Sequence, residues 1–179
     1  MPKTVQHRNR EKADRVIDSY NIAYQTRNFE IQLFWQRSNY FLVLNTAIIA
    51  GIAIKLGSID PIVAVFIAFG IFVSCLWYRV NLGSKFWQTR WEQRLHEIEE
   101  RVSPSANLFS ATQAQIKADV ENSIKSTGGQ GWWRSYVNKQ ALSKPSVSRQ
   151  MILLSIGFIC LYVALLAIWI VGILLGNVA

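Results

Sequence analysis

Residues 151–175 read MILLSIGFICLYVALLAIWIVGILL, and this stretch decides the class of the protein. It contains no charged residue, and Ser155 is its clearest polar interruption. An α-helix needs about 20 mostly apolar residues to cross the hydrocarbon core of a bilayer. The stretch is therefore long enough to span a membrane with some tilt, and the chain is predicted to be a membrane protein.

Two shorter apolar runs precede it. Residues 40–56 are interrupted by Asn45, Thr46 and Lys55, and residues 62–78 are interrupted by Ser74. Both runs lie near the lower limit of about 17 residues for a spanning helix. Because only a short turn separates them, they should form an antiparallel hairpin. The sequence thus predicts an all-α membrane protein with three transmembrane helices and long helices that extend beyond the membrane.

Positive charge is distributed very unevenly along the chain, whose formal net charge is +8. Of 19 Lys and Arg residues, seven lie in residues 1–39, eleven in residues 79–150, and one, Lys55, between the first two spans. Cytoplasmic loops of membrane proteins carry such an excess. We therefore expect a cytoplasmic N-terminus, a cytoplasmic segment 79–150 and an external C-terminus.

The chain accordingly divides into four predicted segments. Residues 1–39 form a cytoplasmic amphipathic helix, 40–80 the two-helix hairpin, 81–147 a cytoplasmic helical region and 148–179 the third span. An apolar stripe with helical spacing of three and four residues predicts one continuous helix over residues 62–102. The stripe consists of Trp87, Trp91, Leu95, Ile98 and Val102. We expect Trp87, Trp91 and Ile98 to be covered by the N-terminal arm, predicted to be helical from about Glu11, or by a neighbouring subunit.

The region after residue 102 shows signals of shorter helices. Ser110 with Gln113 has the spacing of a capping box, which predicts a helix that ends near Ser126. Aromatic residues then alternate with basic ones, as in segments that lie at the level of lipid headgroups. This aromatic segment contains Trp132, Trp133, Arg134, Tyr136 and Lys139.

No constellation of catalytic or metal-binding residues stands out. The only histidines are His7 and His96. Glu97, Glu99 and Glu100 would be scattered around a helix, so a solvated charged face explains them better than a metal site or acid–base pair. We expect no enzyme activity, no metal and no cofactor.

Polar and small residues inside the spans admit two interpretations. Asn45 and Thr46 either make hydrogen bonds between helices or line a pore or gate, since a polar side chain is costly in lipid. Gly172 and Gly176 are separated by four positions on the third span, a spacing that allows close packing within or between subunits.

The cytoplasmic basic residues also have two explanations. The topology signal and contact with anionic headgroups account for an excess of positive charge without any ligand. Alternatively, the charge binds an anionic regulator such as a nucleotide or oligonucleotide. The candidates near the membrane are Arg27, Arg37, Lys85, Arg90 and Arg94. Arg90 and Arg94 share a helix face at positions i and i+4.

Several motifs resemble a known bacterial family. They are TRNFEIQLFWQRS at residues 26–38, GSKFWQ at 83–88, Trp91-Glu92 and Ser146-Val147-Ser148. Together they resemble the RipA-type octameric membrane proteins. In that family a His and an Asp often follow the Trp-Glu pair closely, whereas this chain has Arg94 and Leu95 there, with His96 and Glu97 beyond.

The resemblance implies a homo-oligomer, such as an octamer, in the bacterial inner membrane. Similar small multi-span proteins serve as membrane effectors of anti-phage defence beside a nucleotidyltransferase, as in Hailong-type systems. We therefore expect an oligomeric channel-like effector gated by a cytoplasmic anionic ligand or partner. The alternative is a scaffolding protein of the envelope that does not conduct.

Overall fold

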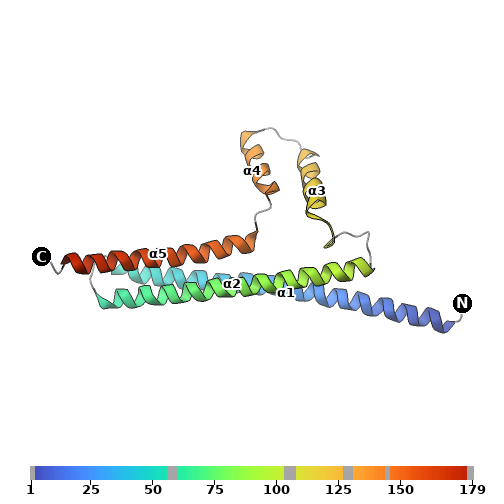
Figure 1. Cartoon of the computed structure of the whole chain (residues 1–179), viewed down its shortest axis with the longest axis horizontal. Helices are drawn as coiled ribbons and strands as arrows, with labels where there is room; N and C mark the ends of the chain where they lie inside the picture. The colour runs from blue at the N-terminus through green and yellow to red at the C-terminus, as the bar shows by residue number, and fades with distance from the viewer. Residues whose placement is uncertain (1–2, 56–59, 103–107, 127–130, 144–145, 177–179) are drawn as a thin grey trace. The chain divides into compact units, whose positions relative to one another are not determined.

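The computed structural model describes residues 3–55, 60–102, 108–126, 131–143 and 146–176, and every regular element in these ranges is an α-helix (Figure 1). The helices are α1 (Lys3–Ile54), α2 (Pro61–Val102), α3 (Gln113–Ser126), α4 (Trp132–Leu142) and α5 (Val147–Gly176). Three of them, α1, α2 and α5, contain stretches long and apolar enough to cross a membrane. The predicted all-α fold with three transmembrane helices is confirmed.

The long helices begin where their sequences allow. Asp60 caps α2, because its Oδ1 atom accepts a hydrogen bond of 3.0 Å from the backbone amide of Ile62, and Pro61 occupies the first helical position, where its missing N–H costs nothing. The predicted continuous helix over residues 62–102 is confirmed. Helix α1 begins at Lys3 rather than near Glu11, since residues 3–10 contain neither Gly nor Pro to stop it.

The chain forms two compact units, and each unit draws on several helices. We call Met1–Glu30 with Trp87–Ser146 the arm unit, and Ile31–Phe86 with Val147–Ala179 the span unit. Because α1 and α2 are both long, each contributes one part to the arm unit and another to the span unit.

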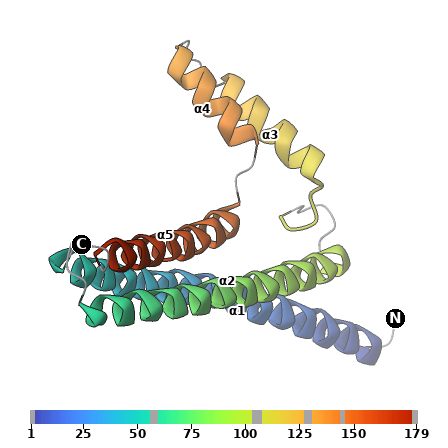
Figure 2. The same ribbon diagram turned by 60° about the vertical axis from the view of Figure 1, so that its left-hand side comes forward.

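The span unit is built from three helices that lie side by side in both views (Figures 1 and 2). Its apolar core consists of Ile48, Ile52, Val63, Ile67, Val73 and Tyr162. Trp77 joins the three helices, since its ring stacks on Phe41 of α1 at 6.1 Å and contacts Phe158 of α5 at 5.8 Å between ring centroids.

In the arm unit, α1 and α2 bury Ala23 and Leu95, and the short helices α3 and α4 pack against each other. The expected capping box at Ser110 and Gln113 is wrong by two positions. Thr112 caps α3 instead: its amide donates to Gln115 Oε1 at 2.7 Å, and its hydroxyl accepts from the Gln115 amide at 3.3 Å. The same reciprocal pattern forms two residues later because α3 starts at Gln113, which makes Thr112 the N-cap.

Candidate functional site

Asn45 links all three helices of the span unit. Its Nδ2 donates to the carbonyl of Phe41 at 2.9 Å, and its Oδ1 accepts from the hydroxyl of Ser74 on α2 at 2.9 Å. The hydroxyl of Tyr162 on α5 donates to the backbone carbonyl of Asn45 at 3.2 Å. The Asn45 side chain is fully buried. Of the two interpretations of Asn45, the structure therefore shows hydrogen bonding between helices of one protomer. Polar groups whose hydrogen bonds are satisfied in this way help to hold helices together in apolar surroundings.

Thr46 points elsewhere, although it follows Asn45 directly. Its side chain is exposed, and its hydroxyl donates to the carbonyl of Leu42 at 2.8 Å. Thr46 lies on a row of exposed positions along α1 with alternating steps of four and three residues, so the row forms one helix face. This α1 outer face consists of Gln32, Gln36, Asn39, Val43, Thr46, Ala50 and Ala53.

The exposed faces of the other two spans have a different chemistry. On α2 most exposed residues in the span are bulky and apolar, including Ile62, Val65, Phe69, Phe72 and Leu76. On α5 they are mostly aliphatic, including Leu153, Leu161, Ile168, Val171 and Leu175. Such side chains suit contact with lipid tails. The α1 outer face differs from these faces because it carries amide and hydroxyl side chains beside small residues, with Val43 as its one bulky apolar member.

Gly172 and Gly176 both lie at exposed positions of α5. A Cβ added to Gly172 would meet no atom within 4 Å, so Gly172 makes no close helix contact inside the protomer. Another glycine does: a Cβ on Gly70 of α2 would lie 2.4 Å from the ring of Tyr162. The sequence did not predict this close approach of Tyr162 to Gly70, because nothing in the α2 sequence marks Gly70 as the partner of a tyrosine on α5.

Of the five basic candidates, Arg27 is the least exposed. Its guanidinium lies 3.5 Å from a carboxylate oxygen of Glu92 and 5.4 Å from the ring centroid of Phe109, a cation–π distance. Only 25% of the Arg27 side chain is exposed. Its charge therefore joins α1, α2 and the loop before α3, all within the arm unit.

The other four basic candidates lie at exposed positions. Arg37 and Lys85 belong to the span unit, while Arg90 and Arg94 belong to the arm unit. Arg90 and Arg94 lie one turn apart on α2, and Arg94 forms an ion pair with Glu97 at 3.0 Å. The structure thus brings Arg90 and Arg94 together and gives Arg27 a different set of contacts.

The three residues expected to be covered by the N-terminal arm or by a neighbouring subunit differ in exposure. Trp87 is 48% exposed, whereas Trp91 and Ile98 are half-buried. Leu95, on the same stripe, is completely buried. The arm unit therefore covers the stripe most fully at Leu95 and leaves about half of Trp87 exposed.

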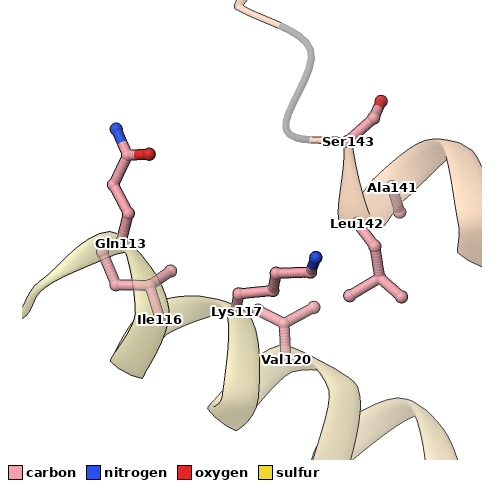
Figure 3. A pocket seen from close by; sticks show the side chains of 7 residues that line it. All are labelled: Gln113, Ile116, Lys117, Val120, Ala141, Leu142 and Ser143. Atoms are coloured by element: carbon pink, nitrogen blue, oxygen red, sulfur yellow. The ribbon is translucent and has the colours of Figure 1, made fainter.

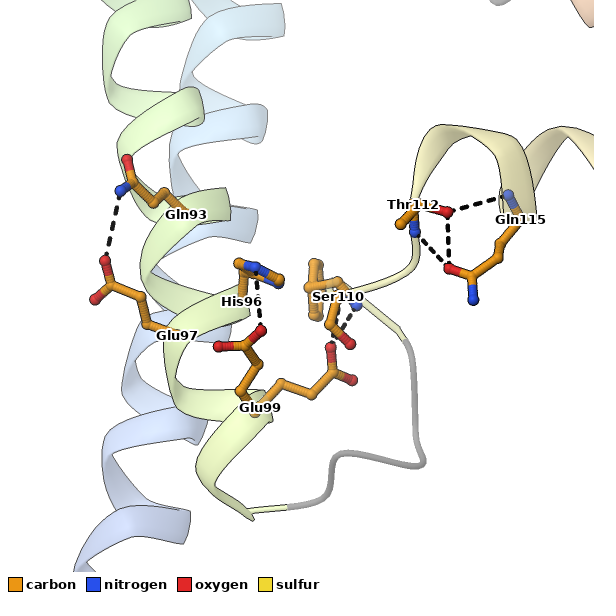
Figure 4. A network of polar contacts seen from close by, with 9 residues as sticks. Gln93, His96, Glu97, Glu99, Ser110, Thr112 and Gln115 are labelled. Carbon is orange, nitrogen blue, oxygen red and sulfur yellow. Dashed lines mark hydrogen bonds and ion pairs between the residues drawn. The ribbon is translucent and has the colours of Figure 1, made fainter.

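Glu99 is the residue that the sequence interpretation misjudged. The expectation that Glu97, Glu99 and Glu100 form a solvated face is wrong for Glu99, which is 2% exposed. Its carboxylate accepts backbone hydrogen bonds from Leu108 at 2.7 Å, Phe109 at 2.7 Å and Ser110 at 2.8 Å. Figure 4 shows Ser110 beside this carboxylate. Successive amides that converge on an anion form a nest. We call this arrangement the Glu99 nest.

Electrostatics around the Glu99 nest follow from these contacts. Burial alone would raise the pKa of Glu99, but the hydrogen bonds from Phe109, Leu108 and Ser110 outweigh it and lower the pKa below the ordinary value. Burial, followed by the negative charge of Glu99, raises the pKa of Tyr20. The rings of Tyr20 and Phe109 lie 6.4 Å apart. The Glu99 nest therefore attaches the loop before α3 to α2, and the contact between Tyr20 and Phe109 attaches it to α1.

A small pocket lies between α3 and α4, with a volume of about 210 Å³. Its walls are mainly apolar, and Lys117 extends from α3 toward α4 (Figure 3). The lining residues are Gln113, Ile116, Lys117, Val120, Ala141, Leu142 and Ser143. Lys117 is its one charged group, and no acid or histidine lines it, so the pocket offers no acid–base pair.

Within the described ranges, no three His, Cys, Asp or Glu side chains are grouped so that they could hold a metal ion.

No curated protein and no solved structure matches the chain. A family model, described as the octameric membrane protein family (8xMP), matches residues 17–171. Because this match covers well over half of the 179 residues, the chain belongs to the octameric membrane protein family.

Proposed function

We propose that the chain is the subunit of an oligomeric channel in the bacterial inner membrane, whose conducting path is lined by the α1 outer face. The observation that carries this proposal is the difference between the exposed faces of the three spans. Within the predicted span, residues 40–56, this face exposes Thr46, Ala50 and Ala53 beside Val43, and Gln36 and Asn39 extend it just before the span. The spans of α2 and α5 expose mainly aliphatic and aromatic side chains. Polar side chains in a span face a protein interior or a water-filled path.

The hydrogen bonds inside the protomer favour a path between subunits. Asn45 and Ser74 bond to each other, and Tyr162 bonds to the Asn45 carbonyl. Their side chains are fully buried beside an apolar core. A ring of subunits, as the family description implies, would place one span of each copy nearest its axis, and α1 has the chemistry that water solvates.

Gating by a cytoplasmic anion extends the proposal. The supporting features are the exposed Arg37, Lys85, Arg90 and Arg94 and the unbroken course of α1 and α2, each of which has residues in both units. A helix without a break can carry a displacement along its length. The ligand class is a nucleotide or oligonucleotide, and a nucleotidyltransferase of an anti-phage defence system would be the partner that makes it.

Cysteine accessibility in proteoliposomes tests the path. The sequence contains two cysteines, Cys75 and Cys160. In a Cys75→Ser/Cys160→Ser background, a charged thiol reagent should modify Thr46→Cys and Ala50→Cys and reduce ion flux. The matched control is Phe69→Cys on α2, which should react slowly because it faces lipid. Reaction of Phe69→Cys alone, or no reaction at any of the three positions while flux continues, would contradict the assignment of α1.

The second candidate function is a scaffold that organises partners at the membrane without conduction. Exposed apolar side chains on the arm unit favour it, including Ile22 at 62% and Phe29 at 56% exposure. Vesicles that stay tight to ions, both alone and with short anionic oligonucleotides, would favour the scaffold. Ion flux that is blocked by modification of Thr46→Cys would favour the channel.

A further inference from the structure

Helix α4 presents one strongly aromatic surface that no described residue covers. Trp132 is 81% exposed, Trp133 60%, Tyr136 54% and Val137 43%. The rings contact one another, with Trp132 and Trp133 5.7 Å apart and Trp133 stacked on Tyr136 at 5.9 Å between centroids. We call these four residues the aromatic face of α4.

The opposite side of α4 is already occupied. Leu142 is half-buried and lines the pocket with Ile116 and Val120 of α3. A helix turns by about 100° per residue, so Leu142 lies roughly 180° from Trp133. The packing between α3 and α4 therefore uses the Leu142 side and leaves the aromatic face outward.

Positive charge flanks the aromatic face on both edges. Arg134 lies about 100° from Trp133 in one direction and Lys139 about 120° in the other. Both side chains are exposed, and α4 contains no acidic residue. Trp and Tyr with flanking Lys and Arg are typical of helices at the bilayer interface, where rings sit among the headgroups and cations reach the phosphates.

The chain keeps α4 close to a membrane. Only residues 143–146 separate the end of α4 from the start of the span α5. Five steps of extended chain cover at most about 18 Å. We propose that α4 binds an anionic phospholipid surface through its aromatic face, with Arg134 and Lys139 paired with lipid phosphates. This proposal does not depend on whether the protein conducts ions.

Lipid-quenching of site-specific labels in the full chain tests it. Single cysteines at Val137, on the aromatic face, and at Ser135, on the other side, are labelled with a fluorophore in a Cys75→Ser/Cys160→Ser background. The protein is placed in nanodiscs of phosphatidylcholine with or without phosphatidylglycerol, each containing lipid spin-labelled near the headgroup. We expect roughly severalfold stronger quenching at Val137 than at Ser135, enhanced by the anionic lipid.

Charge reversal provides the decisive comparison. Arg134→Glu/Lys139→Glu should reduce quenching at Val137 to the level found in neutral nanodiscs. Lys117→Glu/Lys125→Glu on α3 makes the same change in net charge and should leave it unaltered. Equal quenching at Val137 and Ser135, or quenching independent of lipid charge, would overturn the proposal. So would a Val137 label shielded from both lipid and aqueous quenchers, because a second copy or another protein would then cover the face.

Discussion

The hydroxyl of Tyr162 on α5 donates a hydrogen bond of 3.2 Å to the backbone carbonyl of Asn45 on α1, 117 positions earlier in the chain. The tyrosine ring reaches this carbonyl by passing over Gly70 of α2, where any Cβ would lie 2.4 Å from the ring. One ring therefore fixes the separation of three helices.

Substitution of Gly70 by Ala should destabilise the span unit by about 1–3 kcal/mol, because the added methyl group overpacks a filled site. Thermal unfolding in mild detergent measures the effect. Gly83→Ala is the matched control on the same helix: a Cβ there meets nothing within 4 Å, and alanine favours the helix by up to about 1 kcal/mol. Equal changes in unfolding temperature for the two variants would show that the Tyr162 ring does not pack closely against Gly70.

Glu99→Gln should weaken the attachment of the loop before α3, since charge-assisted hydrogen bonds to the nest are lost; the cost is about 1–3 kcal/mol. Hydrogen exchange at the amides of Leu108, Phe109 and Ser110 reports on it. Glu100→Gln is the neighbouring control, because Glu100 is exposed and interacts with His96 at 3.6 Å. Faster exchange in both variants alike would contradict a specific role for Glu99.

The same contact predicts a pH dependence. The folded-state pKa of Glu99 lies below its ordinary value of 4.5, so the carboxylate stabilises the nest fully above that value. Its contribution is lost as the pH falls through the lowered folded-state pKa. Protection of the three amides in the wild type should therefore approach that of Glu99→Gln only in acid. A difference that stays constant down to the lowest pH at which the chain remains folded would oppose this linkage.

Leu95→Ala should destabilise the arm unit by about 2–5 kcal/mol, because Leu95 is completely buried and its removal leaves a cavity. Trp87→Ala should cost the isolated protomer less, because Trp87 is 48% exposed, and should instead weaken subunit association if neighbouring copies cover it. Unfolding and oligomer mass in detergent separate the two effects. Trp87→Ala oligomers as stable as the wild type would remove Trp87 from the subunit interface.

Binding of short anionic oligonucleotides should weaken in Arg90→Glu/Arg94→Glu and, in the wild type, decline steeply with salt. Lys117→Glu/Lys125→Glu changes the net charge equally and should retain most of the binding. Fluorescence anisotropy at several salt concentrations measures both. Equal binding by the two double variants, or a signal that salt does not change, would exclude the Arg90 and Arg94 pair as the sensor.

Orientation is testable with a membrane-impermeant thiol reagent on intact spheroplasts. In the background without Cys75 and Cys160, Gly176→Cys should react from outside, and Lys125→Cys should react only after lysis. The reason is the concentration of Lys and Arg in residues 1–39 and 79–150. External labelling of Lys125→Cys would reverse the proposed topology.

The positions and lengths of the long helices were predictable from the sequence, and the contacts between distant residues were not. Apolar runs and helical spacing predicted the bounds of α2 almost to the residue. Both signals depend only on the order of apolar and polar residues in one segment of the sequence. The hydrogen-bond partners of Asn45 could not be predicted, since Ser74 and Tyr162 become its neighbours only when the helices pack together. The Glu99 nest was missed for a related reason: its donors are backbone amides, which every residue except proline possesses.

In the span unit, one side of α1 is buried against the other helices and the opposite side is exposed. Asn45 and Ile48 lie on the buried side, and Thr46 and Ala50 lie on the exposed side. Insertion of one residue would rotate everything beyond it by about 100°, which would carry Asn45 out of reach of Ser74. A seven-residue insertion nearly restores the rotation, but it lengthens the helix by about 10 Å, a third of the hydrocarbon thickness. The number of residues in this part of α1 is thus as tightly constrained as their identity.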